Sequence, residues 1–240
     1  MFDGNFFVVT FLKLWKAVPV TLEITIVSLA VGIVLGFFIA LARVHKVKVL
    51  SQISAIYVSV FRGTPIVLQI LVVYSVIPSV LNAYFKSIGS SINIFDLNPI
   101  VYAFIVFGLN NAAGLSEVFR SALLTVNKGQ FEAAYTQGFN YFGTMYYIIL
   151  PQSIKIILPP MVNQVVNLIK NTSCLYIIGG SDLISLTYSF VTGASTGGAY
   201  GPAYLVCGVM FFIFCYPLSK MASSWENNLK KRDRMTSTAK

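Results

Sequence analysis

The chain has 240 residues, of which 56% are apolar and only 10% are charged. Soluble domains carry about 25% charged residues, so composition excludes a water-soluble protein, a disordered chain and a collagen-like repeat. The net charge of +9 comes from basic residues that flank long apolar runs, which is typical of a membrane protein rather than a nucleic-acid-binding one. The three cysteines lie in apolar stretches and are expected to be buried free thiols.

A helix needs about 20 mostly apolar residues to cross the hydrocarbon core. The sequence therefore predicts an all-α membrane protein with five spans, at about 19–43, 63–85, 97–122, 150–178 and 203–222. Before them, residues 1–16 are expected to form an interfacial segment with Trp15 at the headgroups. Residues 17–225 then form the transmembrane domain, and residues 226–240 form a basic cytoplasmic tail. A glycine-rich segment, 193–202, separates the last span from the apolar residues before it.

Span one carries small residues at four-residue spacing, namely Ser28, Gly32, Gly36 and Ala40. Such a stripe lets another helix approach closely in lipid, and we interpret it as a packing surface. Span two begins beside Arg62, which we expect to be a cytoplasmic charge that snorkels to the membrane surface rather than a ligand.

The distribution of basic residues predicts the orientation. They are concentrated after span one, between spans three and four, and in the tail, whereas residues 86–98 and 179–202 contain few. The positive-inside rule then places the N-terminus outside and the C-terminus in the cytoplasm. Lys13 and Lys16 would lie outside, against this rule, which is why they are assigned to the interfacial segment.

Residues 128–148, between spans three and four, contain a second helical signal. Residues 130–137 favour a helix, Glu132 in the first turn suits the positive end of its dipole, and Gly138 permits a left-handed reversal. Pro151 suits the first turn of span four. We therefore expect a short cytoplasmic helix that is rigidly joined to two membrane helices.

The same loop reads Glu132-Ala133-Ala134, three residues, Gly138, nine residues, and then an Ile-Ile-Leu-Pro segment that ends in Leu150 and Pro151. This resembles the EAA loop of bacterial ABC import permeases. Other segments resemble the polar amino-acid permeases (histidine, glutamine, arginine and cystine type), and these are 61–65 followed by Gln69, 116–120, 128–130 and 168–173. The resemblance covers about 15–225. This sequence differs from the family's usual pattern at three places. It has Asn127 where the family usually has Pro and Gly114 where it often has Tyr, and its residues 178–181 are richer in glycine.

The resemblance implies a type I ABC importer (MetI-like) permease in the bacterial cell membrane. It implies a second permease subunit, identical or paralogous, a cytoplasmic ABC ATPase dimer, and an extracellular or periplasmic amino-acid-binding protein. The sequence has no Gly-x-x-x-x-Gly-Lys-Ser/Thr motif, so we expect a non-catalytic subunit without a cofactor, with ATP and Mg²⁺ on the partner ATPase. The residues expected to couple to that ATPase are Glu132, Ala133, Ala134, Gly138, Leu150 and Pro151.

Polar side chains inside the spans are costly and are candidates for function. The candidates for a substrate pathway are Asn110, Asn111, Glu117, Gln164, Asn167, Lys170, Asn171, Thr172 and Ser173. In the alternative interpretation, Glu117 pairs with Arg120 one turn on, or with Lys170, and only holds helices together. His45 is expected to be a solvated loop residue, and no metal cluster or nucleophile–base set is visible.

The resemblance leaves the substrate open among cystine, glutamine, glutamate, arginine and histidine, because in this family a separate binding protein sets much of the selectivity. The overall pattern favours cystine. Whether the pore is a homodimer or a heterodimer also stays open. An ATP-independent secondary transporter or channel would predict an inverted repeat with paired broken helices, which the five spans do not display. A membrane-embedded enzyme would need catalytic side chains that one histidine and scattered carboxylates do not supply.

Overall fold

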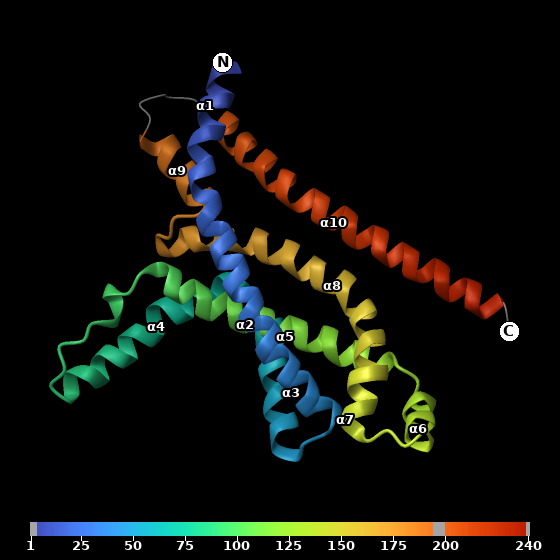
Figure 1. Cartoon of the computed structure of the whole chain (residues 1–240). Coiled ribbons are helices and arrows are strands. Elements are labelled where there is room, and N and C mark those ends of the chain that lie inside the picture. Colours follow the sequence, from blue (N-terminus) through green and yellow to red (C-terminus); the bar gives the residue numbers. More distant parts are fainter. Residues whose placement is uncertain (1–3, 194–199, 239–240) are drawn as a thin grey trace.

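The computed structural model describes residues 4–193 and 200–238, and the regular elements within them are helices (Figure 1). In chain order these are α1 (Gly4–Leu14), η1 (Trp15–Ala17), α2 (Val18–Val44), α3 (Lys48–Gly63), α4 (Ile66–Ser87), η2 (Ile94–Asp96), α5 (Pro99–Thr125), α6 (Lys128–Thr136), α7 (Tyr141–Gly143), η3 (Thr144–Ile149), α8 (Leu150–Asn171), η4 (Thr172–Ile178), α9 (Leu183–Gly193) and α10 (Tyr200–Thr238).

Five helical stretches in the described residues are long and apolar enough to cross a membrane, which confirms the predicted number. They are Asn5–Val44, Ile66–Ser87, Pro99–Thr125, Tyr141–Ile178 and Gly201–Lys231. The interior of the glycine-rich segment, 194–199, and the last two residues of the expected tail, 239–240, lie outside the described residues.

The helix that begins at α1 continues through one 3₁₀ turn directly into α2. Leu14, at the end of α1, is fully buried against Leu183 of α9 and Met210 of α10. The interfacial position of residues 1–16 stays a prediction, but the segment is an extension of the first span that packs on the last one.

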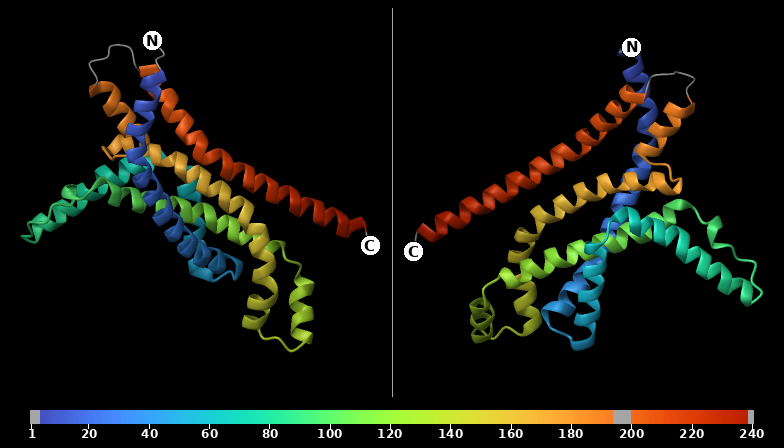
Figure 2. Two further views of the ribbon diagram at one scale, coloured as in Figure 1. Left: turned by 45° about the horizontal axis from the view of Figure 1, so that its top comes forward. Right: turned by 180° about the vertical axis from the view of Figure 1, so that it is seen from behind.

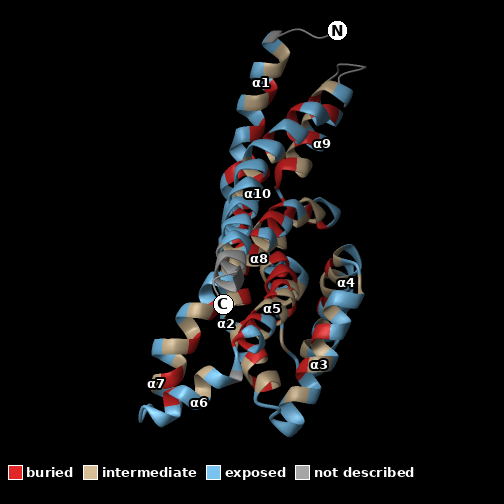
Figure 3. Ribbon diagram, turned by 90° about the vertical axis from the view of Figure 1, so that its right-hand side faces the viewer, coloured by how far each residue is buried: buried red, intermediate tan, exposed pale blue. Residues whose placement is uncertain are grey.

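Helices α2 and α5 cross in the centre of the molecule, and the small-residue stripe of α2 faces this crossing. All four of its members are buried. A Cβ atom at Gly32 would lie 2.6 Å from Nδ2 of Asn111, and one at Gly36 would lie 3.0 Å from the carbonyl oxygen of Ala112. The stripe therefore serves packing, as predicted, because any larger side chain would push α5 away. Figure 3 shows many buried residues along α5, whereas α4 and α6 are largely exposed.

The second span starts later than expected because the chain breaks before it. Pro65 disfavours a helical conformation in the preceding residue, and Thr64 is accordingly extended, with φ −115° and ψ 143°. The amphipathic helix α3, which was not among the expected elements, therefore ends at Gly63, and α4 begins at Ile66.

The helical stretch that contains the fourth span starts earlier than expected and is longer than a span needs, because α7, η3 and α8 follow one another without a gap from Tyr141. Pro151 has no N–H to donate to the preceding turn, and the chain widens there into a π-helical turn, Thr144–Ile149. Such π-helical turns inside longer helices are frequent at functional sites.

The two ends of the bundle are distinct (Figures 1 and 2). One end, here called the α6 end, joins the loop after α2 to α7 through a 2.7 Å hydrogen bond between His45 Nε2 and the Tyr141 hydroxyl. His45, expected to be only solvated, thus has a specific partner. At the opposite end, Asn82 donates a 2.8 Å hydrogen bond to Asn93 in the α4–α5 connection.

Asp182 precedes α9 at the opposite end and is fully buried. Its carboxylate accepts hydrogen bonds from the backbone N–H groups of Ile184 and Ser185, at 3.2 Å and 2.9 Å, and therefore caps the helix. Burial nevertheless raises the pKa of Asp182 above its usual value, against the opposing effect of these hydrogen bonds.

A pH dependence of stability follows from the raised pKa of Asp182. The folded protein holds this proton more tightly than the unfolded chain does, so deprotonation favours unfolding. The free energy of unfolding should fall as pH rises from about 4, the unfolded pKa, and level off above the folded pKa. Asp182→Asn, which keeps an accepting oxygen, should remove this slope. The measurement is the thermal midpoint of the wild type and of Asp182→Asn at several pH values. The prediction is contradicted if both midpoints change with pH in the same way.

Candidate coupling helix and intramembrane polar network

Helix α6 is capped at both ends by its own sequence. Asn127 accepts a 2.9 Å hydrogen bond from the Gly129 N–H at the start, so the residue that replaces the family's usual proline serves as an N-cap. At the other end, the Phe139 N–H bonds to the Ala134 carbonyl at 3.1 Å and the Gly138 N–H to the Tyr135 carbonyl at 3.0 Å. This pair of bonds is a Schellman motif.

Gly138 completes that motif with φ +82°, which confirms the predicted left-handed reversal. A Cβ atom there would have nothing within 4 Å. The position therefore favours glycine because of its backbone conformation and not for lack of space, since the rest of this chain leaves room for a side chain there.

Helix α6 packs against the bundle through one of its faces. Ala134 is buried, and Phe131 packs against Leu123 at the end of α5 and Ile149 at the end of η3. Gln152 of α8 donates a 2.5 Å hydrogen bond to the Gln130 side chain. Contacts with α5, η3 and α8 therefore hold α6 against the bundle.

The remaining coupling residues are divided between the anchored and the exposed faces of this segment. Leu150 belongs to the anchoring cluster, whereas Glu132, Ala133 and Pro151 are exposed. The adjacent turn adds exposed aromatic side chains, with Phe142 80% exposed and Tyr146 and Tyr147 68% and 69% exposed. These rings were not among the expected coupling residues, although six aromatic residues between positions 135 and 147 were a visible signal.

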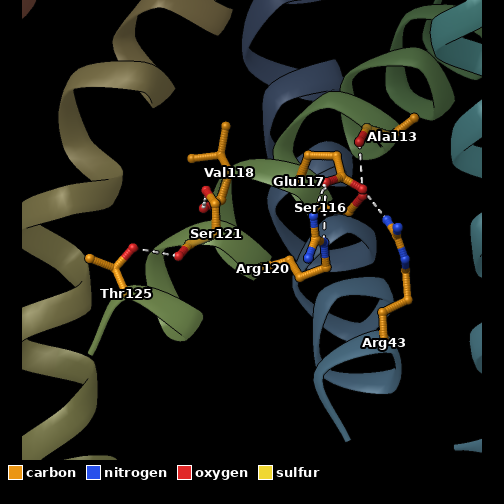
Figure 4. A network of polar contacts seen from close by, with 8 residues as sticks. All are labelled: Arg43, Ala113, Ser116, Glu117, Val118, Arg120, Ser121 and Thr125. Atoms are coloured by element: carbon orange, nitrogen blue, oxygen red, sulfur yellow. Dashed lines mark hydrogen bonds and ion pairs between the residues drawn. The ribbon is translucent and has the colours of Figure 1, made fainter. Parts of the chain in front are cut away.

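Glu117 of α5 is bridged by two arginines, as Figure 4 shows. Its carboxylate pairs with Arg43 of α2 and with Arg120 one turn on, at 2.8 Å. The Glu117 and Arg43 side chains are only 20% and 19% exposed. Of the expected partners, Arg120 is confirmed, whereas the second ion pair is made by Arg43 and not by Lys170. This geometry favours the structural interpretation of Glu117, because its oxygens are already engaged.

A second polar network closes the break between α3 and α4. In a continuous helix the Phe61 carbonyl would accept a hydrogen bond from residue 65, but Pro65 has no N–H. Gln69 Nε2 donates to that carbonyl instead, at 2.8 Å, and Asn110 Nδ2 of α5 donates to it at 3.2 Å. The Asn110 amide also donates to Gln69 Oε1 at 3.0 Å. Gln69, which the pathway hypothesis omitted, belongs to one of the segments that resemble the amino-acid permeases.

This network predicts a conditional effect of Gln69→Leu. The substitution removes one of the two donors to the Phe61 carbonyl and the bonds from Gln69 to Thr64 and Asn110, and it should lower the free energy of unfolding by about 1–3 kcal/mol. Pro65→Ala restores a backbone N–H at the break, so Gln69→Leu should cost less in that background. Thermal unfolding of the single and double variants in detergent tests this, and an equal cost in both backgrounds would refute the assignment.

The other candidate pathway residues do not form one cluster. Asn111 is buried and donates to the Ser28 carbonyl at 3.4 Å, and buried Thr172 donates to the Ile169 carbonyl at 2.8 Å. Gln164 is half-buried beside Gly114, where a Cβ atom would lie 2.7 Å from its Nε2. The α8 residues Asn167 and Lys170 are exposed, and Asn171 and Ser173 are half-buried. Within the described residues, no three His, Cys, Asp or Glu side chains gather as a metal site would require.

The family model of the binding-protein-dependent transport system inner membrane component matches residues 32–223. The chain belongs to this family. The permease is similar to an arginine transport system permease protein of Bacillus subtilis, with 31% identity over 91% of this chain and 93% of that protein. An L-cystine transport system permease protein of the same species is 32% identical, over 88% and 84%.

Solved structures agree with this assignment. A chain of an amino acid ABC transporter crystallised with histidines matches 95% of the permease and 99% of its own length, with a TM-score of 0.76 and 26% identity. A chain of an inward-facing methionine ABC transporter has a TM-score of 0.64 at 14% identity, over 93% of the permease and 99% of that chain. This second match shows the MetI-like fold alone. The permease is thus a multi-pass protein of the bacterial inner membrane.

Proposed function

We propose that this permease is the membrane subunit of an ABC importer that carries a polar amino acid, with cystine among the candidates, into the cytoplasm. It pairs with a second permease, receives substrate from an extracellular or periplasmic binding protein, and is driven by two ATPase subunits that hold the ATP and Mg²⁺. The similarity to arginine and L-cystine permeases supports an amino-acid substrate.

The observation that carries this proposal is the structure of the α6 end. A short helix with one anchored face and one exposed face, fixed to α5 and α8, suits docking into a groove of a separate protein. The exposed aromatic rings of Phe142, Tyr146 and Tyr147 extend this surface, and large apolar side chains are typical of protein interfaces. On this proposal the α6 end faces the cytoplasm, in line with its basic loops.

The proposed mechanism is a rigid-body tilt. When the ATPases close on ATP, they draw the α6 helices of the two permeases together. Since α6 moves with α5 and α8, the tilt of these helices opens the pathway on one side of the membrane and closes it on the other.

Co-expression with the ATPase subunit tests the proposal. We expect the ATPase to copurify with the permease in mild detergent. Proteoliposomes that contain both should transport an amino acid only when two conditions are met. ATP must be on the side of the membrane that carries the ATPase, and the binding protein must be on the opposite side. A permease that purifies alone and transports without ATP would instead support a secondary transporter.

A further inference from the structure

The break between α3 and α4 lies beside the middle of α5 and not beside either of its ends. The Phe61 carbonyl is hydrogen-bonded to Asn110, which is near the midpoint of α5 (Pro99–Thr125), itself one of the spans. Helix α3 starts at the α6 end and is about 24 Å long at 1.5 Å per residue. The break is therefore far from the surface at which α3 begins.

Arg62, next to this break, is an unpaired cation. It is exposed, and among the described residues it makes no ion pair and no side-chain hydrogen bond. The expected snorkelling of Arg62 to the cytoplasmic surface does not fit this position, since nearly the whole of α3 separates it from that end. A charge at this depth faces a water-filled cavity or an opposite charge, because hydrocarbon would be too costly.

The backbone beside Arg62 leads to the same conclusion. Gly63 and Pro65 are exposed, and a Cβ atom at Gly63 would meet nothing within 4 Å. Irregular backbone at membrane depth is tolerated only where it is covered by protein or lines an aqueous cavity. In secondary transporters, helices broken in this way commonly form substrate sites near the midplane. Thr64, Gln69 and Asn110 hold this break in a fixed shape.

We propose that Arg62 receives the carboxylate of the transported amino acid at the α3–α4 break. This inference rests on the proposed function. A guanidinium binds a carboxylate through two parallel hydrogen bonds, and every amino acid carries that group whatever its side chain. The site therefore recognises the common part of the substrate and leaves side-chain selectivity to other residues.

The test uses the complete transporter, permease with ATPase, in nanodiscs without the binding protein. The probes are L-arginine, L-glutamine and L-cystine and their carboxamides, which lack the carboxylate charge. We expect the wild type to bind at least one acid more tightly than its amide. Arg62→Gln should weaken binding of that acid at least about tenfold, equivalent to about 1.4 kcal/mol, with little effect on the amide. Arg62→Lys should recover part of the loss, and Lys86→Gln, a cation at the far end of α4, should behave as wild type.

An unchanged acid-to-amide ratio in Arg62→Gln would overturn the inference. So would a loss of transporter assembly in Arg62→Gln, because Arg62 would then serve a contact between subunits. Failure of the wild type to take up any amino acid with ATP and the binding protein would instead overturn the proposed function. ATP hydrolysis in the absence of substrate should be equal in all variants, which separates binding from assembly.

Discussion

The transporter carrying Gly138→Asp is expected to insert normally into the membrane and to lose ATP-driven uptake by at least about tenfold. The left-handed conformation at Gly138, with φ +82°, costs an L-residue about 1–2 kcal/mol, which the bundle can bear. No atom lies within 4 Å of the added Cβ, so the chain itself has no clash. The new carboxylate instead projects from the surface that we propose docks on the ATPase. Uptake and substrate-stimulated ATP hydrolysis in proteoliposomes measure the effect.

Gly89 provides a matched control at the opposite end. It has φ +73°, and a Cβ atom there would likewise have nothing within 4 Å. Gly89→Asp therefore imposes the same backbone cost and the same charge, away from α6, and should keep uptake near the wild-type rate. Normal transport by Gly138→Asp, or equal losses in both variants, would contradict the coupling role of α6.

Glu117→Ala should produce the largest loss of stability. It removes the carboxylate between Arg43 and Arg120 and leaves two partly buried cations side by side in a span. Breaking a buried ion pair by removing one partner costs about 3–5 kcal/mol. Since Arg120 is 33% exposed, we expect about 3 kcal/mol, measured by thermal or denaturant unfolding in detergent.

A double-mutant cycle separates the structural role from a pathway role. Arg43→Ala should cost less in the Glu117→Ala background than in the wild type, because its partner is already gone. Glu226→Ala breaks an exposed pair with Lys230 and should change stability by less than about 1 kcal/mol. If Glu117→Ala keeps its stability but changes the affinity for an amino acid, the carboxylate belongs to the substrate pathway.

The arginine bridges also bear on the proposed mechanism. Arg43 is near the end of α2, and Glu117 is on the part of α5 that leads to α6. The ion pair therefore ties α2 to the helix that α6 would move. Together with the bond between His45 and Tyr141, it extends the rigid body from α6 to α2, so that a motion of the coupling helix reaches the first span.

The break between α3 and α4 shows where local and tertiary information meet. Gly63 and Pro65 are visible in the sequence, but the pattern alone predicted no break there and placed the start of span two, with Arg62, at the membrane surface. Only the contact between Phe61 and Asn110, residues far apart in the chain, places it next to the middle of α5.

The sequence by itself determined the features that depend on neighbouring residues. Hydrophobic length predicted the five spans, small residues at four-residue spacing predicted the packing face of α2, and Gly138 predicted the end of α6. These hold because a bilayer demands long apolar helices and because backbone conformation is local. The tertiary structure alone decided that Arg43 is a partner of Glu117, that Gln69 and Asn110 replace the hydrogen bond missing at Pro65, and that Asn111 bonds to the Ser28 carbonyl. A polar side chain in a span needs a partner, but its sequence position does not say which helix will cross beside it.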